Sequence, residues 1–373
     1  MSLSRGSRWF LAFGLLAVAG VAAGVYYLDT EVFVDEVEPG QPVEYTVQRG
    51  ASVRFVGDEL AELGVVRSSF RFRSAAEEVD LASSLQPGVF ELETGMEPEE
   101  AVSVLESGPL APPSIVFTVP EGLTVDQTLE RLAEQFPAHE VEDYEEVLAA
   151  RRAIDLEDDE VSVAGLLSVP DWVPDPAAVD GDLQAFEGLL WPQTYEVVDT
   201  ASPLQVLQRM IDQLDVELAA LPDELREAVP AEALYDKLIM ASLIERETRV
   251  DEERNLVAGV IQNRLDEGVP LQIDATVVYA LGGGPRDVVL LEDLEIDSPY
   301  NTYQTEGLPP TPIAGVGTAA FQAAFEPAET DFLFYVLAPE CDGSHVFAET
   351  FEEHQANVAA FRESNRCQDD QIG

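Results

Sequence analysis

The sequence predicts an α+β protein in which a small strand–helix unit precedes a larger mixed region. Strand–turn–helix patterns recur in the first third of the chain, and an apolar helix is expected near residues 234–248. Beyond that helix, helical stretches, short strands and Pro-rich loops alternate as far as residue 361. With 373 residues and a hydrophobic fraction of 46%, the chain can hold two or three domains with a sizeable core.

The N-terminal segment predicts a membrane anchor. The run from Trp9 to Leu28 has no charged residue and is long enough to cross a hydrocarbon layer of about 30 Å. Arg5 and Arg8 precede the run and acidic residues follow it, so the positive-inside rule places Met1 in the cytoplasm and the rest of the chain outside. A cleaved signal peptide is the alternative, because small residues occur at 21–24. The length of the run and its aromatic end at Tyr26 favour a retained anchor.

Two strand–turn–helix patterns follow the anchor. In the first, alternation over 44–47 predicts a strand and the stretch 53–64 an amphipathic helix ending on glycine. A strand at 88–92 and a helix at 97–106 complete this small unit. A second copy of the pattern has its strand at 115–119 and its helix at 125–135. Amphipathic periodicity then predicts a helix over 202–221, before the apolar helix of 234–248.

The charge of the chain excludes several partners. It has 72 acidic and 20 basic residues, for a formal net charge of −52. Such a surface repels nucleic acid and anionic lipid, so we expect no nucleic-acid partner. The acidic residues are dispersed along the chain, which favours a protein adapted to concentrated salt, where screening weakens their mutual repulsion. An ordinary acidic secreted protein is the alternative.

No metal site or cofactor is expected. The three histidines are far apart in the sequence, and no cysteine cluster accompanies them. The two cysteines, Cys341 and Cys367, either form one disulfide outside the membrane or remain free thiols. The serine-hydrolase and zinc-protease motifs G-x-S-x-G and H-E-x-x-H do not occur. Gly282 to Pro285 lacks the GK[ST] of a phosphate loop and is interpreted as a connector.

Glu245 and Glu247, near the end of the apolar helix, are the candidates for acid–base chemistry. Arg249 lies four residues after Glu245, a spacing that predicts an ion pair keeping this carboxylate ionised at the surface. Glu247 has Asp251 at the same spacing and apolar residues one and two turns before it. We therefore expect burial to raise the pKa of Glu247 toward the value that a general acid needs. Alternatively, both glutamates are solvated partners of nearby arginines.

Two later stretches have the composition of a sugar-binding cleft. Ser298 to Tyr303 (SPYNTY) supplies aromatic faces with amide and hydroxyl groups, and the prolines of 307–313 (GLPPTPI) would keep a loop rigid. A Pro-rich surface loop is the simpler interpretation. His345 and His354 lie near acidic and aromatic residues, but a single histidine is more often structural than catalytic.

These motifs together resemble those of the YceG-like family of membrane-anchored endolytic murein transglycosylases. The resemblance covers about residues 40–361 and rests on motifs that occur in the family's order: EGLLWPQTY at 187–195, ASLIERET at 241–248, NRL at 263–265, LQIDAT at 271–276, SPYNTY, GLPPTPI, GSHVF at 343–347 and Glu353-His354. Three positions depart from the family pattern. Ala275 replaces its usual Pro, Thr311 its Gly and Gln355 its frequent Asn.

The resemblance implies a domain organisation. A cytoplasmic tip and membrane anchor at 1–28 and a linker at 29–42 precede a small LysM-like unit at 43–110. A mixed α+β catalytic region at 111–365 and a tail at 366–373 follow. The substrate would be the glycan strands of peptidoglycan, cut internally to limit the length of new strands, and peptidoglycan synthases are the implied protein partners.

The resemblance also assigns the site residues. The essential glutamate of the family corresponds to Glu247, which would act first as acid and then as base, closing a 1,6-anhydro ring on muramic acid. By resemblance and polarity, the residues expected to bind the substrate are Gln272, Asp274, Thr276, Tyr300, Asn301, Thr302, Tyr303, Pro309, Pro310 and His345. Two alternatives stay open: a hydrolytic muramidase, in which Asp274 or Glu245 positions a water molecule, and a non-catalytic wall-binding protein.

Overall fold

The computed structural model describes residues 38–153, 165–283, 289–340 and 342–364, and it divides into two compact units between Pro113 and Ser114. Helices and small two-stranded antiparallel sheets build both units, which confirms the α+β prediction. Among the described residues, no helix is long and apolar enough to cross a membrane. The expected anchor at 9–28, the tail at 366–373 and both cysteines lie outside the described residues.

The first unit packs its helices against one two-stranded antiparallel sheet. Its elements are β1 (Pro42–Val47), α2 (Val53–Glu62), α3 (Ser69–Glu78), α4 (Leu81–Ser84), β2 (Gly88–Glu93) and α5 (Pro98–Glu106). β1 and β2 pair antiparallel, with Tyr45 opposite Phe90 in the core. α2 and α3 approach closely at Gly57, where an added β-carbon would meet the Phe72 ring at 2.7 Å. Glycine is therefore needed there for the two helices to touch.

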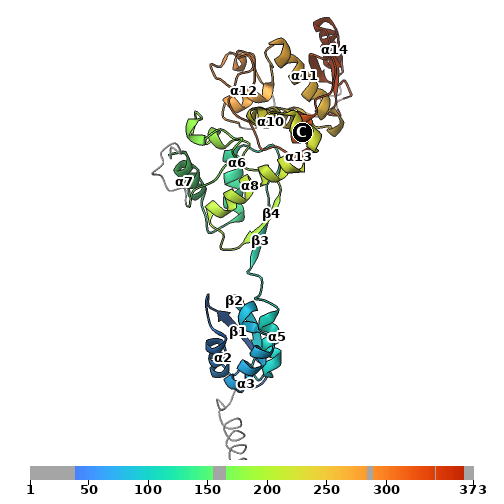
Figure 1. Ribbon diagram of the computed structural model, residues 1–373. Helices are drawn as coiled ribbons and strands as arrows, with labels where there is room; N and C mark the ends of the chain where they lie inside the picture. The colour runs from blue at the N-terminus through green and yellow to red at the C-terminus, as the bar shows by residue number, and fades with distance from the viewer. Residues whose placement is uncertain (1–37, 154–164, 284–288, 341, 365–373) are drawn as a thin grey trace, which may run out of the picture. The chain divides into compact units, whose positions relative to one another are not determined.

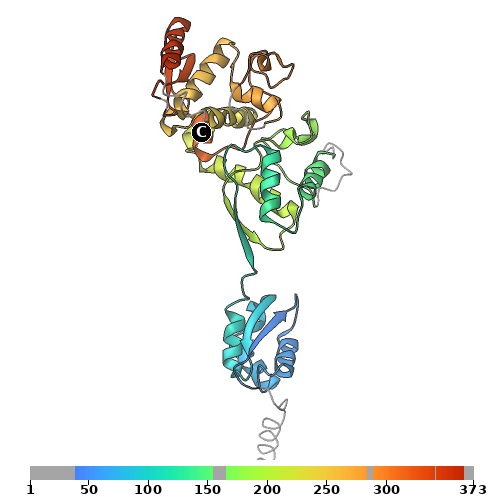
Figure 2. The same ribbon diagram turned by 180° about the vertical axis from the view of Figure 1, so that it is seen from behind.

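The second unit contains the remaining strands and helices. They are β3 (Ser114–Thr118), α6 (Val125–Gln135), α7 (Val141–Arg152), β4 (Thr194–Val198), α8 (Pro203–Ala220), α9 (Asp223–Ala228), α10 (Leu234–Glu247), α11 (Arg254–Glu267), α12 (Asp274–Ala280), α13 (Thr318–Phe325), β5 (Phe334–Leu337), β6 (His345–Ala348) and α14 (Phe351–Glu363). Both ribbon views show α6, α7 and α8 with β3 and β4 toward one end of this unit, and α10 to α14 toward the other (Figures 1 and 2).

Helix α10 is the centre of the second unit's core. Nine of its fourteen residues are buried, and it packs against α11, α12 and α13. Burial of each large aliphatic side chain stabilises the fold by about 2 kcal/mol, so α10 is fixed firmly in place. Its last residue is Glu247, because Thr248 adopts an extended conformation and its hydroxyl bonds back to the Ile244 carbonyl at 2.7 Å. Glu247 thus lies at the end of a rigid core helix.

Several predicted elements are confirmed, and some were missed. The helices expected over 53–64, 97–106, 125–135, 202–221 and 234–248 form with small shifts at their ends. The strand of the second strand–turn–helix pattern does not extend the first unit. It pairs as β3 with β4, where Phe117 lies opposite Tyr195 and the two rings stack at 5.4 Å. The sequence did not predict β4, nor α3 and α4.

Candidate active site

A polar cavity of about 600 Å³ opens beside the end of α10. The walls come from α10, α11, α14, the β5–β6 hairpin and the loop that enters α12. The lining residues are Arg246, Glu247, Arg249, Arg264, Leu271, Gln272, Asp274, Tyr303, Phe334, Tyr335, Val336, Leu337, Gly343, His345, Phe351 and His354. Five of the predicted site residues, Glu247, Gln272, Asp274, Tyr303 and His345, are among them.

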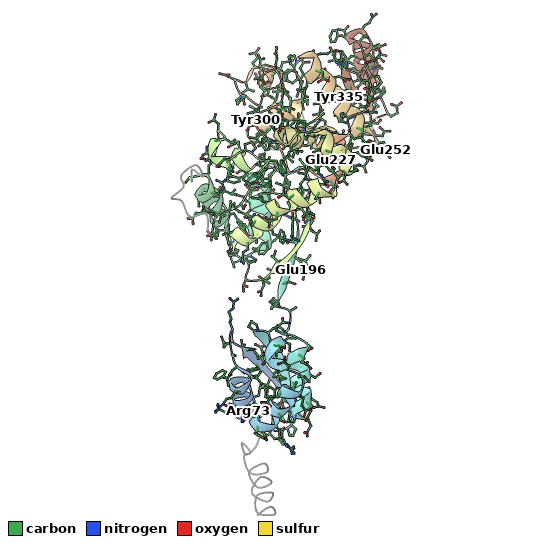
Figure 3. The ribbon with its side chains drawn as sticks, viewed as in Figure 1. Arg73, Glu196, Glu227, Glu252, Tyr300 and Tyr335 are labelled. Atoms are coloured by element: carbon green, nitrogen blue, oxygen red, sulfur yellow. The ribbon has the colours of Figure 1, made fainter. Side chains whose placement is uncertain are left out.

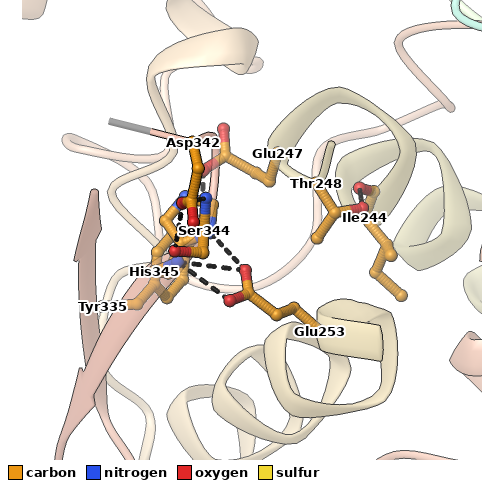
Figure 4. A network of polar contacts seen from close by, with 8 residues as sticks. All are labelled: Ile244, Glu247, Thr248, Glu253, Tyr335, Asp342, Ser344 and His345. Carbon is orange, nitrogen blue, oxygen red and sulfur yellow. Dashed lines mark hydrogen bonds and ion pairs between the residues drawn. The ribbon is translucent and has the colours of Figure 1, made fainter. Parts of the chain in front are cut away.

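Glu247 is the central acidic group of this cavity. Its carboxylate accepts a hydrogen bond of 2.8 Å from the hydroxyl of Tyr335 on β5 (Figure 4). Burial raises the pKa of Glu247, and the nearby Asp274 raises it further. The Tyr335 hydrogen bond acts in the opposite direction, as does the positive charge of Arg246, because both favour the carboxylate. The upward shift predicted from the apolar helix is therefore confirmed in direction and cause.

Glu245 has a different environment from the one the sequence predicted. The predicted ion pair with Arg249 is wrong, because α10 ends at Glu247 and the cations that act on Glu245 are Arg254 and Arg246. Glu245 instead accepts a hydrogen bond of 3.2 Å from the backbone N–H of Gly317 at the start of α13. Burial raises its pKa, and the Glu121 charge adds to the shift. Glu245 does not line the cavity.

His345 is held by Glu253, the last residue of a 3₁₀ turn (η4, Asp251–Glu253). The Glu253 carboxylate lies 2.8 Å from Nδ1 of His345 and accepts the His345 backbone N–H at 2.9 and 3.1 Å (Figure 4). Because a carboxylate can only accept, Nδ1 carries the hydrogen and Nε2 is left for other partners. The His345 ring meets the Tyr335 ring edge-on at 5.3 Å, which brings this pair next to the Glu247 contact.

The loop entering α12 forms the opposite wall. Gln272 has a positive φ of 51°, which is uncommon for a residue with a side chain. Thr302 holds this loop through two hydrogen bonds. Its backbone carbonyl accepts the Gln272 N–H at 3.0 Å, and the Thr302 side-chain hydroxyl accepts the Ile273 N–H at 3.0 Å. Asp274, two residues further on, accepts a hydrogen bond of 2.6 Å from the hydroxyl of Tyr303. Backbone strain fixed in this way often occurs at binding sites.

The other predicted residues lie behind this wall. Thr276, Asn301 and Thr302 have no exposed surface, and the two threonine hydroxyls bond to each other at 2.9 Å. Asn301 fixes its loop through the carbonyls of Leu294 and Ile296, each at 2.9 Å. The structure therefore places these side chains as supports of the cavity wall.

Tyr300 and the two prolines are also absent from the cavity lining. The Tyr300 hydroxyl bonds to Thr311 at 2.8 Å, and its ring packs against Tyr279 at 4.9 Å. Pro309 is buried and Pro310 is exposed, but neither lines the cavity. This aromatic and Pro-rich loop therefore packs into the body of the unit.

Residues 45–360 match the YceG-like family. The chain belongs to the YceG-like family.

Two curated relatives extend this match. The chain is 32% identical over 314 residues to the endolytic murein transglycosylase of Bacillus subtilis (strain 168), covering 84% of this chain and 82% of that protein. It is 27% identical over 360 residues to the endolytic murein transglycosylase of Streptococcus pneumoniae serotype 2 (strain D39), covering 94% of this chain and 64% of that protein.

A solved structure resembles this YceG-like protein as well. It is the 2.6 Å crystal structure of a yceG-like protein from Listeria monocytogenes, with a TM-score of 0.55 and 29% sequence identity. The match covers 85% of this chain and 99% of that chain.

Sequence reasoning missed several members of the site in this YceG-like protein. Tyr335, Glu253 and Arg249 were not proposed, although they contact or flank Glu247 and His345. Arg249 and Glu253 could have been suspected as site residues only because they lie close to Glu247 in the sequence. Tyr335 comes from β5, a strand of four residues in which only the fold shows which side chain faces the cavity.

A second buried carboxyl lies outside the cavity. Glu187 is 3% exposed and accepts hydrogen bonds of 3.0 Å from the Val125 N–H and from the Tyr279 hydroxyl. Burial raises its pKa to about 8. Since Val125 begins α6 and Tyr279 belongs to α12, Glu187 joins these helices as a structural group. In the described ranges, no three His, Cys, Asp or Glu residues are grouped so that they could hold a metal ion.

Proposed function

We propose that this protein is an endolytic lytic transglycosylase that cleaves the β-1,4 bond between N-acetylmuramic acid and N-acetylglucosamine inside peptidoglycan strands. The observation that carries the proposal is Glu247, a carboxyl with a raised pKa on the wall of a polar cavity. Membership of the YceG-like family and the printed activity of the curated relatives support the same reaction.

The chemistry needs one carboxyl that changes roles. Protonated Glu247 donates its proton to the glycosidic oxygen as the bond to C1 of muramic acid breaks and an oxocarbenium-like centre develops. The 6-hydroxyl of the same sugar then attacks C1, and its proton passes to the Glu247 carboxylate. The new bond closes a 1,6-anhydro ring, and the enzyme returns to its starting protonation state without consuming water.

The surroundings of Glu247 suit both roles. Burial favours the neutral acid before cleavage, whereas the Tyr335 hydrogen bond stabilises the carboxylate that forms afterwards. Gln272, Asp274, Tyr303 and His345 offer hydrogen-bonding groups to the sugar along the same cavity. Asp274 also adds negative charge close to the developing positive centre.

The two alternatives fit the geometry less well. A hydrolytic muramidase needs a second carboxylate to hold water, and Glu245 does not line the cavity. Asp274 does, but its carboxylate already accepts the Tyr303 hydroxyl at 2.6 Å. A purely wall-binding protein would not need a carboxyl with a raised pKa on the wall of a polar cavity, because burying such a group costs stability.

We also propose where the protein works. The uncharged run at 9–28 and the charges on either side favour a single-pass protein of the cell membrane, with the catalytic unit on the outer face. Peptidoglycan synthases at that face are the expected partners, since limiting new strands requires access to them. The net charge of −52 supports a working environment of high salt.

The decisive test is the mass of the cleavage products. Full-length protein in detergent is incubated with uncross-linked glycan strands in high salt, beside Glu247→Gln and the matched control Glu252→Gln, an exposed residue labelled in Figure 3. We expect 1,6-anhydro ends, one water lighter than reducing ends, from the wild type and from E252Q, and no cleavage by E247Q.

Each contrary result points to a different reaction. Reducing ends would identify a hydrolase. Cleavage that persists in E247Q would exclude Glu247 as the acid. Intact strands that remain bound to the wild type at every salt concentration would identify a binding protein.

A further inference from the structure

Positive charge is concentrated around the Glu247 cavity. The chain has only 20 basic residues against 72 acidic ones, yet Arg246, Arg249 and Arg264 all line this one cavity. An acidic surface elsewhere repels anions, so a cavity with three guanidinium groups is a local exception. The three arginines differ in how far their guanidinium groups are available to a ligand.

Arg264 is committed to the fold. Its guanidinium donates to the backbone carbonyls of Leu333, Pro270 and Leu271 at 2.6, 3.1 and 2.7 Å, and the residue is 8% exposed. It also stacks over the Phe334 ring at 5.1 Å. These contacts join the start of β5 to the loop before α12, so Arg264 holds the two walls of the cavity together.

Arg246 is committed in part. It is exposed on the last turn of α10, and one of its terminal nitrogens donates to the Gly122 carbonyl at 3.0 Å. Its charge acts on Glu247, whose carboxylate form it favours. Arg246 therefore has an electrostatic role toward the acid and a structural one toward the turn before α6.

Arg249 differs from both. It follows the end of α10 and is exposed, and the described residues offer its guanidinium no hydrogen bond or ion pair. Its aliphatic part is nonetheless positioned, because a β-carbon at Gly343 would meet Cβ and Cδ of Arg249 at 3.5 and 3.7 Å. The stem thus packs along the turn before His345, and the charged end remains at the edge of the cavity.

We propose that Arg249 binds a carboxylate of the stem peptide that the muramic acid residue carries through its lactyl group. A guanidinium presents paired N–H donors that match the two oxygens of a carboxylate. The amino sugars themselves are uncharged, so the carboxylates of a glycan strand lie on the peptide or, where the peptide has been removed, on the bare lactyl group. This proposal rests on the function proposed above, and it makes the enzyme selective for strands that still carry peptides.

The test compares three kinds of strand that present different carboxylates. They are uncross-linked strands with free peptide carboxylates, the same strands with these groups converted to amides, and strands without peptides, which expose the lactyl carboxylate. Full-length wild type, Arg249→Ala and Arg249→Lys are compared with Arg209→Ala, which removes an exposed arginine of α8 away from the cavity. Initial rates give kcat and KM separately.

We expect R249A to lower kcat/KM about tenfold on strands with free peptide carboxylates, mainly through KM, because the charge-assisted hydrogen bonds to the carboxylate are lost. R249K should recover part of the loss, and R209A should show none. On amidated strands R249A and the wild type should be equal. The difference should also shrink at 1 M salt, where the Debye length is about 3 Å.

Other results would overturn the proposal. Equal loss on all three strands would mean that Arg249 supports the fold or the reaction and does not recognise a carboxylate. Loss confined to strands without peptides would assign Arg249 to the lactyl carboxylate instead. Binding of peptide strands to E247Q, with and without R249A, is measured as well. This binding difference tests the carboxylate site even if the protein proves to have no transglycosylase activity.

Discussion

The hydroxyl of Tyr335 on β5 donates a 2.8 Å hydrogen bond to the carboxylate of Glu247, the last residue of α10. Tyr335 and Tyr300 are both labelled in Figure 3, but only Tyr335 lines the cavity. The contact opposes the effect of burial, because it stabilises the charged form of a group whose pKa burial raises. A carboxyl that must release a proton and then recover it benefits from both influences.

Tyr335→Phe should separate these influences. Without the hydroxyl, the pKa of Glu247 rises further, because the hydrogen bond that favours the carboxylate is lost. In the proposed mechanism, cleavage requires protonated Glu247, so activity falls as pH rises through this pKa. We therefore expect the alkaline limb of the pH–kcat profile to move to higher pH, while kcat at its maximum drops about tenfold.

The control for this variant is Tyr45→Phe, since Tyr45 belongs to the first unit and its hydroxyl bonds to Glu59. Its pH profile should match that of the wild type. An unshifted alkaline limb in Y335F would mean that the titrating acid is not Glu247.

Glu253→Gln should move the ring hydrogen of His345 from Nδ1 to Nε2. One amide oxygen can still accept the His345 backbone N–H, but the NH₂ group then faces Nδ1, which must become an acceptor. Nε2 gains the hydrogen and changes from acceptor to donor in the cavity. We expect ¹⁵N NMR to report this change, with kcat about tenfold lower and an unchanged unfolding temperature. E252Q should leave both the spectrum and kcat as in the wild type.

A wild-type spectrum with both ring nitrogens protonated would contradict this assignment. So would an E253Q protein that retains the Nδ1–H tautomer.

The sequence indicated a candidate acid but not its partners. The apolar helix and the missing cation favoured Glu247 over Glu245, and the family resemblance assigned the role to Glu247. Tyr335 follows it by 88 residues on a strand of four. Periodicity over four residues cannot define which face of a strand meets a distant helix, because that depends on long-range packing.

The error at Glu245 has a similar origin. The expected pair with Arg249 assumed a helix that continues, and α10 ends between the two residues. Helix ends depend on local capping, here by the Thr248 hydroxyl, and they are harder to predict than the helix itself. Because α10 ends before Arg249, this residue lies at the edge of the cavity. The buried roles of Thr276, Asn301 and Thr302 were also hidden, because polar residues near a site are as often supports as ligands.

Glu245→Gln should retain most of the activity. Its carboxyl accepts the Gly317 N–H, and an amide oxygen can replace it there. The glutamine also avoids the cost of ionising a partly buried carboxyl beside Glu121. We expect kcat within about threefold of the wild type, with anhydro ends still formed, in contrast to inactive E247Q. If the wild type instead formed reducing ends and E245Q formed no product, the result would support the muramidase alternative.

Glu187→Gln should change the pH dependence of stability. The folded-state pKa of Glu187 is about 8, above its ordinary value of 4.5, so the folded protein holds a proton that the unfolded chain has released between these values. The contribution to stability is complete below pH 4.5 and is lost as pH rises through about 8, with a slope of up to about 1.4 kcal/mol per pH unit.

The difference between wild type and variant measures this contribution directly. Glutamine does not titrate, so the free energy of unfolding of E187Q should lack the decline that the wild type shows between pH 5 and pH 8. Urea unfolding followed by the fluorescence of Trp191, which is buried in the same unit, gives both curves. Glu227→Gln, at an exposed position labelled in Figure 3, should follow the wild-type curve. Parallel curves for wild type and E187Q would show that Glu187 is already ionised in the folded state at pH 5.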